Sequence, residues 1–288
     1  MPQWLPTGGA LLVGAHLLNP TTGTWTALPV PADAALAGDP DGGVVALVPG
    51  REGAAPALVW MRVGAQVEVM QQHTIDGLAP AGWRWMHAPL PGGVWVWASG
   101  GVSANDGWDE ACALVRPERD GPPSVHPQPC PPHSFAEVYA IVGTPAGGLV
   151  VASAGEGHPG VDLLAPDANG GFVPVQLPWE DLYPFGPMDI LPRADGSFDL
   201  MSPCPLGPPR PCLATLDRVD LPDRWTQWTP GGALHLRARG RRAAVWPDPT
   251  TSDVAWARGA SAVDGLPAQL CVGPRRGKGR CFSRPGSD

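Results

Sequence analysis

Short apolar segments recur along the chain, and a glycine-containing turn introduces each of them. The turn is Gly-Gly in five copies and Asp-Gly in one, and mostly apolar residues follow it. Short apolar runs bounded by turn residues are typical of buried β-strands. The copies are 34 to 55 residues apart, and repeats of β-type sequence near this period indicate the blades of a β-propeller. They span residues 8–13, 42–47, 92–97, 147–152, 195–200 and 231–236.

Each repeat unit has room for four strands. In residues 135–178 the apolar runs predict strands at 138–142, 149–152, 161–165 and 172–177, with turn residues between them. Residues 185–229 repeat this pattern and end in an alternating strand at 224–228. No segment has the sustained 3.6-residue apolar period of a helix. We therefore predict an all-β fold.

The predicted architecture is a β-propeller of about six four-stranded blades, formed by residues 1–288 as a single domain. The count becomes seven if the two ends of the chain share a blade. Residues 231–288 hold more strands than one blade needs, so the sequence leaves open whether they form one blade or more.

Six cysteines fall into three close pairs, each of which brackets a turn-rich centre. Residues equidistant from a hairpin turn face each other at a distance that a disulfide can bridge, so we predict disulfide-stapled hairpins. Zinc binding by Cys112, His126, Cys130 and His133 is the alternative, but four nearby prolines and an uncommon spacing disfavour it, and we predict no metal site. The predicted pairs are Cys112/Cys130, Cys204/Cys212 and Cys271/Cys281.

Disulfides persist in oxidising compartments, which predicts a periplasmic or extracellular location. The N-terminus has no basic start or apolar core of a signal peptide, so a leader would be absent from this sequence. No apolar run approaches the roughly 20 residues that span a bilayer. The net charge of −8 argues against a nucleic-acid partner, and the basic run at 275–280 is interpreted as a solvated hairpin. No sequence motif indicates a cofactor.

Residues 9–29 resemble a kelch repeat. The turn Asn19-Pro20-Thr21-Thr22 follows the D/N-P-x-T pattern of that family, and the segment from Trp25 to Pro29 follows its W-x-x-L-P pattern. Gly14 stands alone where kelch repeats usually carry two glycines. The resemblance implies a propeller and carries no activity with it.

Loops on one face of the predicted propeller carry the candidate ligand-binding residues. Connections between blades, and those from second to third strands, gather on this face around the central channel. Segments 71–82, 99–109, 153–160 and 178–187 are connections of these two kinds. They contribute His73 and Asp76, and the predicted binding residues Asp106, Trp108, Asp109, Glu110, Glu156, His158, Trp179, Glu180, Asp181 and Tyr183.

Tryptophans flanked by carboxylates suit stacking on a sugar ring or contact with a cationic peptide. We therefore predict a non-enzymatic binding or scaffold propeller that recognises protein or glycan. The alternative is a glycan-active hydrolase or lyase that uses carboxylate pairs such as Asp109/Glu110 and Glu180/Asp181 as acid and base. A third class is a subunit of a larger surface assembly, which a contiguous exposed apolar patch would favour. Ordinary solvated loop charges beside half-buried tryptophans also account for the pattern.

Residues 83–87 form an aromatic cluster with Trp95 and Trp97. Tryptophans at alternate positions of a strand lie on one face of its sheet. Packing between blades is the predicted role, in preference to an exposed aromatic platform. His87 has no evident catalytic partners in the sequence.

Overall fold

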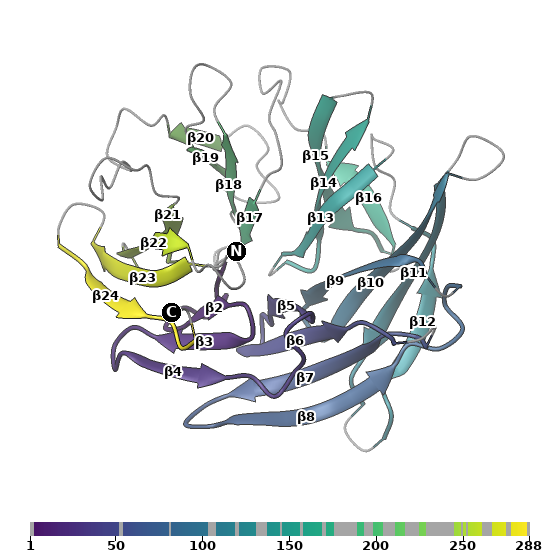
Figure 1. The fold of residues 1–288 in the computed structure, drawn as a ribbon. Coiled ribbons are helices and arrows are strands. Elements are labelled where there is room, and N and C mark those ends of the chain that lie inside the picture. The colour runs from purple at the N-terminus through teal and green to yellow at the C-terminus, as the bar shows by residue number, and fades with distance from the viewer. Residues whose placement is uncertain are drawn as a thin grey trace.

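The protein is all-β in the residues that the computed structural model describes. Its strands form six antiparallel sheets, each built from four consecutive strands (Figure 1). No described helix is long and apolar enough to cross a membrane. The described residues are 3–51, 54–80, 82–102, 108–118, 121–130, 137–144, 146–155, 158–168, 171–175, 189–192, 198–203, 211–216, 225–228, 245–248, 250–251, 253–260, 267–274 and 278–286.

The first three sheets come from the N-terminal half of the chain. The first contains β1 (Gln3–Trp4), β2 (Leu11–Val13), β3 (His16–Asn19) and β4 (Thr24–Ala27). The second contains β5 (Ala35–Gly38), β6 (Gly43–Val48), β7 (Ala57–Val63) and β8 (Val67–Thr74). The third contains β9 (Arg84–Leu90), β10 (Gly93–Val102), β11 (Trp108–Arg116) and β12 (Ser124–Gln128).

The other three sheets repeat the same order of strands. The fourth contains β13 (Glu137–Gly143), β14 (Leu149–Gly155), β15 (His158–Pro166) and β16 (Phe172–Val175). The fifth contains β17 (Asp189–Pro192), β18 (Phe198–Pro203), β19 (Pro211–Leu216) and β20 (Trp225–Trp228). The sixth contains β21 (Val245–Pro247), β22 (Asp253–Ala260), β23 (Pro267–Pro274) and β24 (Arg280–Ser283).

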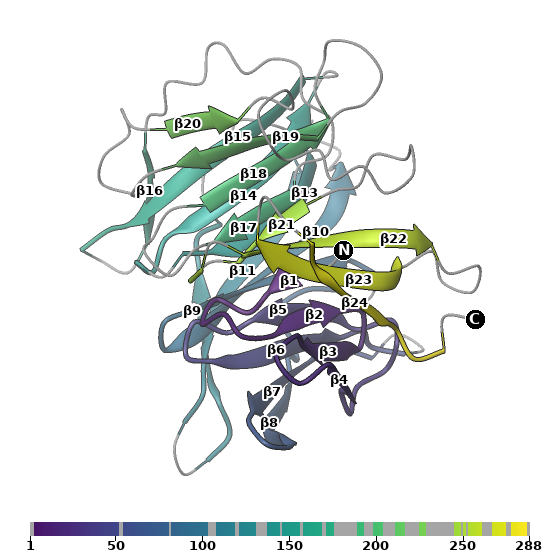
Figure 2. The same ribbon diagram turned by 90° about the vertical axis from the view of Figure 1, so that its left-hand side faces the viewer.

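The sheets are arranged around a central axis as the blades of a β-propeller, which confirms the predicted fold class. The first strand of each sheet lies nearest the axis in Figure 1, and β1, β5, β9, β13 and β17 contact one another in sequence order. Strand β1 also contacts β21, so the last sheet returns to the first. Figure 2 shows these two sheets next to each other at the chain ends. Each described sheet is made from one continuous part of the chain, and the two ends do not share a blade.

Alternate side chains of the second strands fill the spaces between neighbouring sheets. On β6, Val44 packs against the first sheet and Val45 against the third. On β10, Val94 faces the second sheet, whereas Trp95 and Trp97 face the fourth. Strands buried on both faces read as continuous apolar runs, which explains the recurring sequence element. Trp95 and Trp97 are 1% and 0% exposed, which confirms the prediction that they pack between blades.

The glycine signal of the repeat marks the turn from the first to the second strand in the first four sheets. In the second and fourth sheets, the N–H groups of Gly42 and Gly147 donate to the carbonyls of Asp39 and Thr144, both at 2.9 Å. Their φ angles are 94° and 82°, in the left-handed region where glycine is favoured. The turn therefore needs glycine at this position.

The sixth predicted copy, residues 231–236, lies outside the described residues and does not begin the second strand of the last sheet. That strand is β22, and the turn before it is built differently. The Asp248 carboxylate accepts hydrogen bonds from the N–H groups of Thr250 and Thr251, at 2.7 and 3.0 Å. An aspartate side chain can hold a turn in this way without a glycine, so the sequence repeat is lost there.

Two of the three predicted disulfides are present. Cys112 of β11 is joined to Cys130, just beyond β12, and Cys271 of β23 is joined to Cys281 of β24. Their Cα–Cα distances are 5.1 and 3.9 Å. Because Cys112 and Cys130 are bonded to each other, the alternative in which both bind zinc is wrong. Cys204 lies outside the described residues, and its pairing with Cys212 stays a prediction.

Candidate functional site

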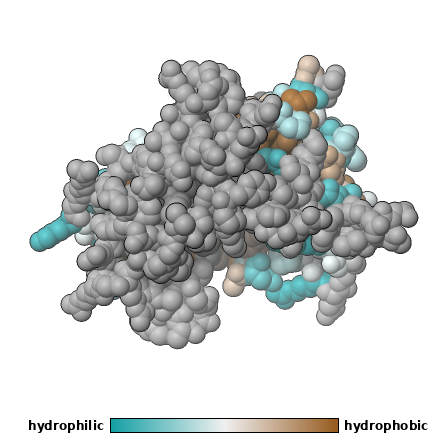
Figure 3. Space-filling view, turned by 90° about the horizontal axis from the view of Figure 1, so that it is seen from above, coloured by the Kyte–Doolittle hydropathy of each residue, from teal (hydrophilic) through white to brown (hydrophobic). Residues whose placement is uncertain are grey.

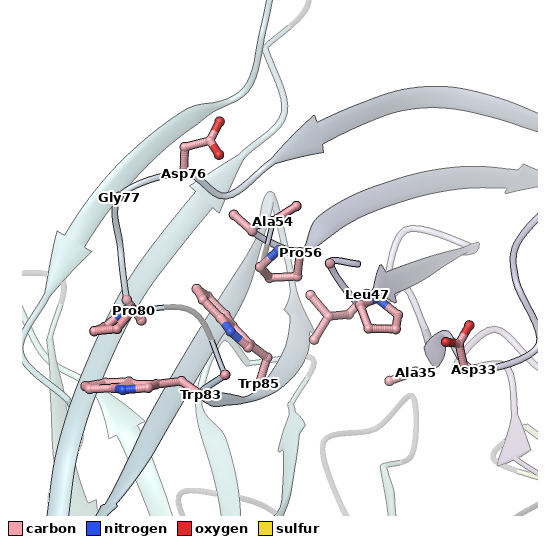
Figure 4. Close-up of a pocket in the computed structure, with 15 residues that line it drawn as sticks. Asp33, Ala35, Leu47, Ala54, Pro56, Asp76, Gly77, Pro80, Trp83 and Trp85 are labelled. Carbon is pink, nitrogen blue, oxygen red and sulfur yellow. The ribbon is translucent and has the colours of Figure 1, made fainter. Parts of the chain in front are cut away.

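A cavity of about 570 Å³ lies where the second sheet meets the start of the third (Figure 4). Three connections form its walls: the segment before β5, the β6–β7 connection and the β8–β9 connection. Most lining residues are alanine, proline or glycine. The larger side chains that line it are Asp33, Leu47, Asp76, Trp83 and Trp85.

All three connections leave the sheets at the same end. In a four-stranded antiparallel meander, the second-to-third connection and the connections to neighbouring sheets emerge on one face. The cavity therefore opens on the face that the sequence analysis selects for ligand binding. It uses the predicted segment 71–82 together with segments that the sequence analysis does not select.

Backbone hydrogen bonds hold these connections together. The N–H of Ile75 donates to the carbonyl of Pro56 at 2.8 Å and joins the β8–β9 connection to the β6–β7 connection. The Ile75 side chain is buried among the residues of the second and third sheets. This anchor fixes the backbone that leads into Asp76.

Trp83 and Trp85 provide the aromatic wall. They occupy alternate positions at the start of β9, and both are partly buried. A Cβ atom at Gly100 of β10 would overlap the indole of Trp83, so this ring lies directly against the β10 backbone. Trp85 packs against the apolar cluster between the second and third sheets. The prediction of packing between blades is confirmed for Trp85, which also lines the cavity.

Arg84, between the two tryptophans, extends to the opposite face of the third sheet. Its guanidinium donates to the carbonyl of Val138 in the fourth sheet at 3.3 Å. Successive side chains of a strand alternate between faces, which explains this separation. No lysine, arginine or histidine belongs to the described residues that line the cavity.

His87 lies two residues further along the same face of β9 than Trp85. Its Nε2 atom is 3.0 Å from the carbonyl oxygen of Val45 on β6. Burial lowers the pKa of His87 to about 4, so the ring is neutral at pH 7 and donates its Nε2 hydrogen to Val45. This bond connects the second and third sheets deeper in the same interface.

Two carboxylates lie at the cavity, and both side chains are exposed. Asp76 begins the β8–β9 connection, and Asp33 precedes β5. Figure 4 shows them on different sides of the cavity, with the tryptophans nearer to each other than the two carboxylates are. The two tryptophans therefore lie together on one wall, whereas the two carboxylates do not form a close pair.

The predicted loop 99–109 is largely a continuation of the β10–β11 hairpin. Ser99 pairs with Glu110, and Val102 pairs with Trp108, with an irregularity between these pairs. The backbone pairing extends the strands beyond the apolar runs that mark them in the sequence. Asp109 and Glu110 are consecutive strand residues, and their side chains project to opposite faces of the sheet.

His158 begins β15 and pairs with Gly155 of β14, so it also belongs to a hairpin and not to a long loop. Asp109 and Glu110 are not among the described residues that line the cavity, and for Trp108 and His158 only the backbone is described. The other candidates lie outside the described residues. They are Asp106, Glu156, Trp179, Glu180, Asp181 and Tyr183.

Asp33 and the connection 49–56 are not among the binding residues predicted from the sequence. The signal for 49–56 is present in the chain, because a Pro-, Gly- and Ala-rich segment joins the second and third strands of one repeat. The segment has no aromatic residue, and its only charged residues are Arg51 and Glu52.

The described surface has few large apolar side chains. Val69, Met70 and Val173 are between 43% and 47% exposed. Figure 3 shows apolar described residues interspersed with hydrophilic ones in the view from above. No contiguous apolar surface of the kind expected for an assembly subunit is evident among these residues.

Comparison with known proteins adds two distant structural similarities. No protein-family model matches the sequence, and no curated protein is similar to it. A protein from Lactobacillus plantarum has 13% sequence identity and a TM-score of 0.42, with 92% of this chain and 70% of that chain covered. A glycoside hydrolase has 11% identity and a TM-score of 0.43, with 99% and 90% covered. Neither similarity assigns an activity to this chain.

Proposed function

We propose that the protein is a non-enzymatic binding propeller that recognises a protein or glycan ligand on the face where the connections gather. The observation that carries this proposal is the cavity between the second and third sheets. It combines two tryptophans, two carboxylates and many small residues. A cavity of about 570 Å³ is within the size range of ligand sites, in which a few placed polar groups orient the ligand.

The rigidity of the surrounding sheets supports a binding role. Trp85 is supported by the core between two sheets, and Trp83 lies on the β10 backbone. Aromatic groups that are already held in position lose little conformational freedom when a ligand binds. The arrangement therefore favours recognition without a large rearrangement.

We also propose that residues 1–288 form a single domain that functions in the periplasm or outside the cell. The disulfides at Cys112–Cys130 and Cys271–Cys281 support this location, because such bonds persist in oxidising compartments.

The hydrolase alternative needs two carboxylates at a suitable separation in one pocket. Asp109 and Glu110 project to opposite faces of a sheet, and Asp33 and Asp76 lie on different sides of the cavity (Figure 4). These arrangements favour binding over glycoside hydrolysis for the described pairs, and the pair Glu180/Asp181 lies outside the described residues.

A binding screen tests the proposal. A panel of neutral oligosaccharides and short peptides is examined by ligand-observed NMR with the native protein and with Trp83→Leu. We expect at least one compound to bind, and its affinity to fall about tenfold in Trp83→Leu, because contact with an indole is worth about 0.5–2 kcal/mol. Trp25→Leu is the matched control, since Trp25 is a partly buried tryptophan that packs between the first and last sheets.

Equal affinities for native protein and Trp83→Leu across the panel would contradict the proposal. Conversion of a bound oligosaccharide into shorter products would support the hydrolase alternative instead.

A further inference from the structure

We propose that the cavity binds a cationic side chain, the guanidinium of arginine or the ammonium of lysine, displayed by a basic peptide segment of a partner protein. This inference rests on the proposed binding function and names the ligand class of the same site.

The hydrogen-bonding side chains of the cavity wall favour a cationic ligand. Apart from the indole N–H groups, the polar side chains of the described residues that line it are the carboxylates of Asp33 and Asp76. An ionised carboxylate accepts hydrogen bonds and donates none. The described lining contains no hydroxyl or amide side chain. A sugar hydroxyl both donates and accepts, whereas a guanidinium has five N–H donors and no acceptor. The carboxylate side chains of the described lining therefore suit a ligand that donates hydrogen bonds.

The charge at the cavity also favours a cationic ligand. Both ionisable residues of the described lining are acidic, and Arg84 directs its guanidinium to Val138 on the other face of the third sheet. Arg51 follows the lining residue Gly50 but does not itself line the cavity. The whole chain carries a net charge of −8. Opposite charge on a partner speeds encounter and stabilises the docked state.

The aromatic wall is the third argument. A cation close to the face of a tryptophan is attracted by the ring quadrupole, and a planar guanidinium can stack on it. Asp76 and Trp83 belong to the same β8–β9 connection, so an arginine side chain bound there would have both kinds of group in one cavity. The cavity, at about 570 Å³, has space for the side chain and part of the backbone that carries it.

Isothermal titration calorimetry with acetyl-Gly-Arg-Gly-amide tests the inference. The matched probe is the same peptide with citrulline, which keeps the shape of arginine and lacks its charge. We expect the arginine peptide to bind at least about tenfold more tightly than the citrulline peptide. The affinity of the arginine peptide falls as the salt concentration rises, because charge attraction at an open site is screened.

Two variants locate the interaction. Asp76→Asn and Asp33→Asn keep the side-chain shape and remove the charge, and we expect each to weaken the arginine peptide several-fold. Asp41→Asn is the control, because Asp41 is an exposed aspartate in the β5–β6 turn at the opposite end of the second sheet. It leaves the affinity unchanged.

The outcomes separate this inference from the proposed function. Equal binding of the arginine and citrulline peptides, or unchanged affinity in both cavity variants, overturns the cationic ligand class. A neutral oligosaccharide that binds in a Trp83-dependent manner, while the arginine peptide does not bind, overturns this inference and leaves the proposed function intact. If Trp83→Leu changes the affinity of no probe, both the cationic ligand class and the proposed binding function are overturned.

Discussion

His87 is a buried, neutral histidine whose hydrogen bond to Val45 connects two sheets. Its environment disfavours the charged ring, because a proton on Nδ1 would bring an imidazolium into the apolar interface. The lowered pKa of about 4 is therefore linked to the stability of this interface.

We predict that protonation of His87 makes the stability of the fold depend on pH. The unfolded state has an ordinary pKa of 6.5 and binds the proton first as pH falls. The free energy of unfolding is therefore highest above pH 6.5. Protonation of His87 in the unfolded state lowers it as pH falls toward 4, by up to about 3 kcal/mol in total. In urea unfolding at pH 7 and pH 5, we expect His87→Gln to lose less stability than the native protein between these two values. The same loss in both proteins would exclude His87 as the titrating group.

Gly100 is another single position with a defined role, because its missing side chain leaves space for the Trp83 indole. We predict that Gly100→Ala displaces this ring and weakens any ligand that depends on Trp83, with a change in unfolding free energy below about 1 kcal/mol. Calorimetry and urea unfolding measure the two effects. Gly121→Ala is the control, because a Cβ atom there has no neighbour within 4 Å. Unchanged ligand affinity in Gly100→Ala would show that the indole is not held by this contact.

At the scale of elements, the outermost strands have the weakest support. Each has a hydrogen-bonded neighbour on one side only, and β24 contains just Arg280–Ser283. The disulfides lie at these edges: Cys271–Cys281 joins β24 to β23, and Cys112–Cys130 holds the end of β12 to β11. The covalent bonds therefore compensate for the small area that these strands bury.

We predict that each of these disulfides stabilises the fold by about 2–3 kcal/mol, because each closes a short loop in the unfolded chain. The loss is slightly larger for the pair separated by 18 residues than for the pair separated by 10. Guanidinium unfolding of Cys112→Ala/Cys130→Ala and of Cys271→Ala/Cys281→Ala measures the two contributions. Stability that does not change in either double variant, or on reduction of the native protein, would contradict this role.

At the scale of the whole molecule, the ring closes by packing and not by a shared sheet. Trp4 and Leu11 of the first sheet contact the same apolar cluster as Ala255 and Leu270 of the last. Near the outer edge, the guanidinium of Arg280 donates to the Thr21 carbonyl at 3.2 Å. The stability of both chain ends therefore depends on one apolar interface.

We predict that Leu270→Ala destabilises the protein by about 2–5 kcal/mol, because it opens a cavity at a site that is 1% exposed. If residues 1–288 form one cooperative domain, unfolding stays a single transition in both tryptophan fluorescence and circular dichroism. Two separate transitions would instead show that the sheets at the chain ends unfold independently of the others. Val69→Ala, at an exposed position, is the control with little effect.

The sequence alone determined the β-class, the four-stranded repeat and the two disulfides that the structure describes. These properties follow from local rules: Gly42 and Gly147 mark turns that need a positive φ, and apolar runs mark strands buried on both faces. Cysteines placed evenly about a hairpin turn face each other for the same local reason.

Only the tertiary structure decided where the cavity forms. Asp33, Leu47 and Trp83 come from three separate segments, and their proximity depends on how two sheets pack around the axis. The sequence also could not predict that pairing extends β10 and β11 to Val102 and Trp108, because hydrogen bonding between backbones continues past the apolar residues. A strand is specified by neighbours along the chain, whereas a binding site is specified by residues that meet only after the sheets have assembled.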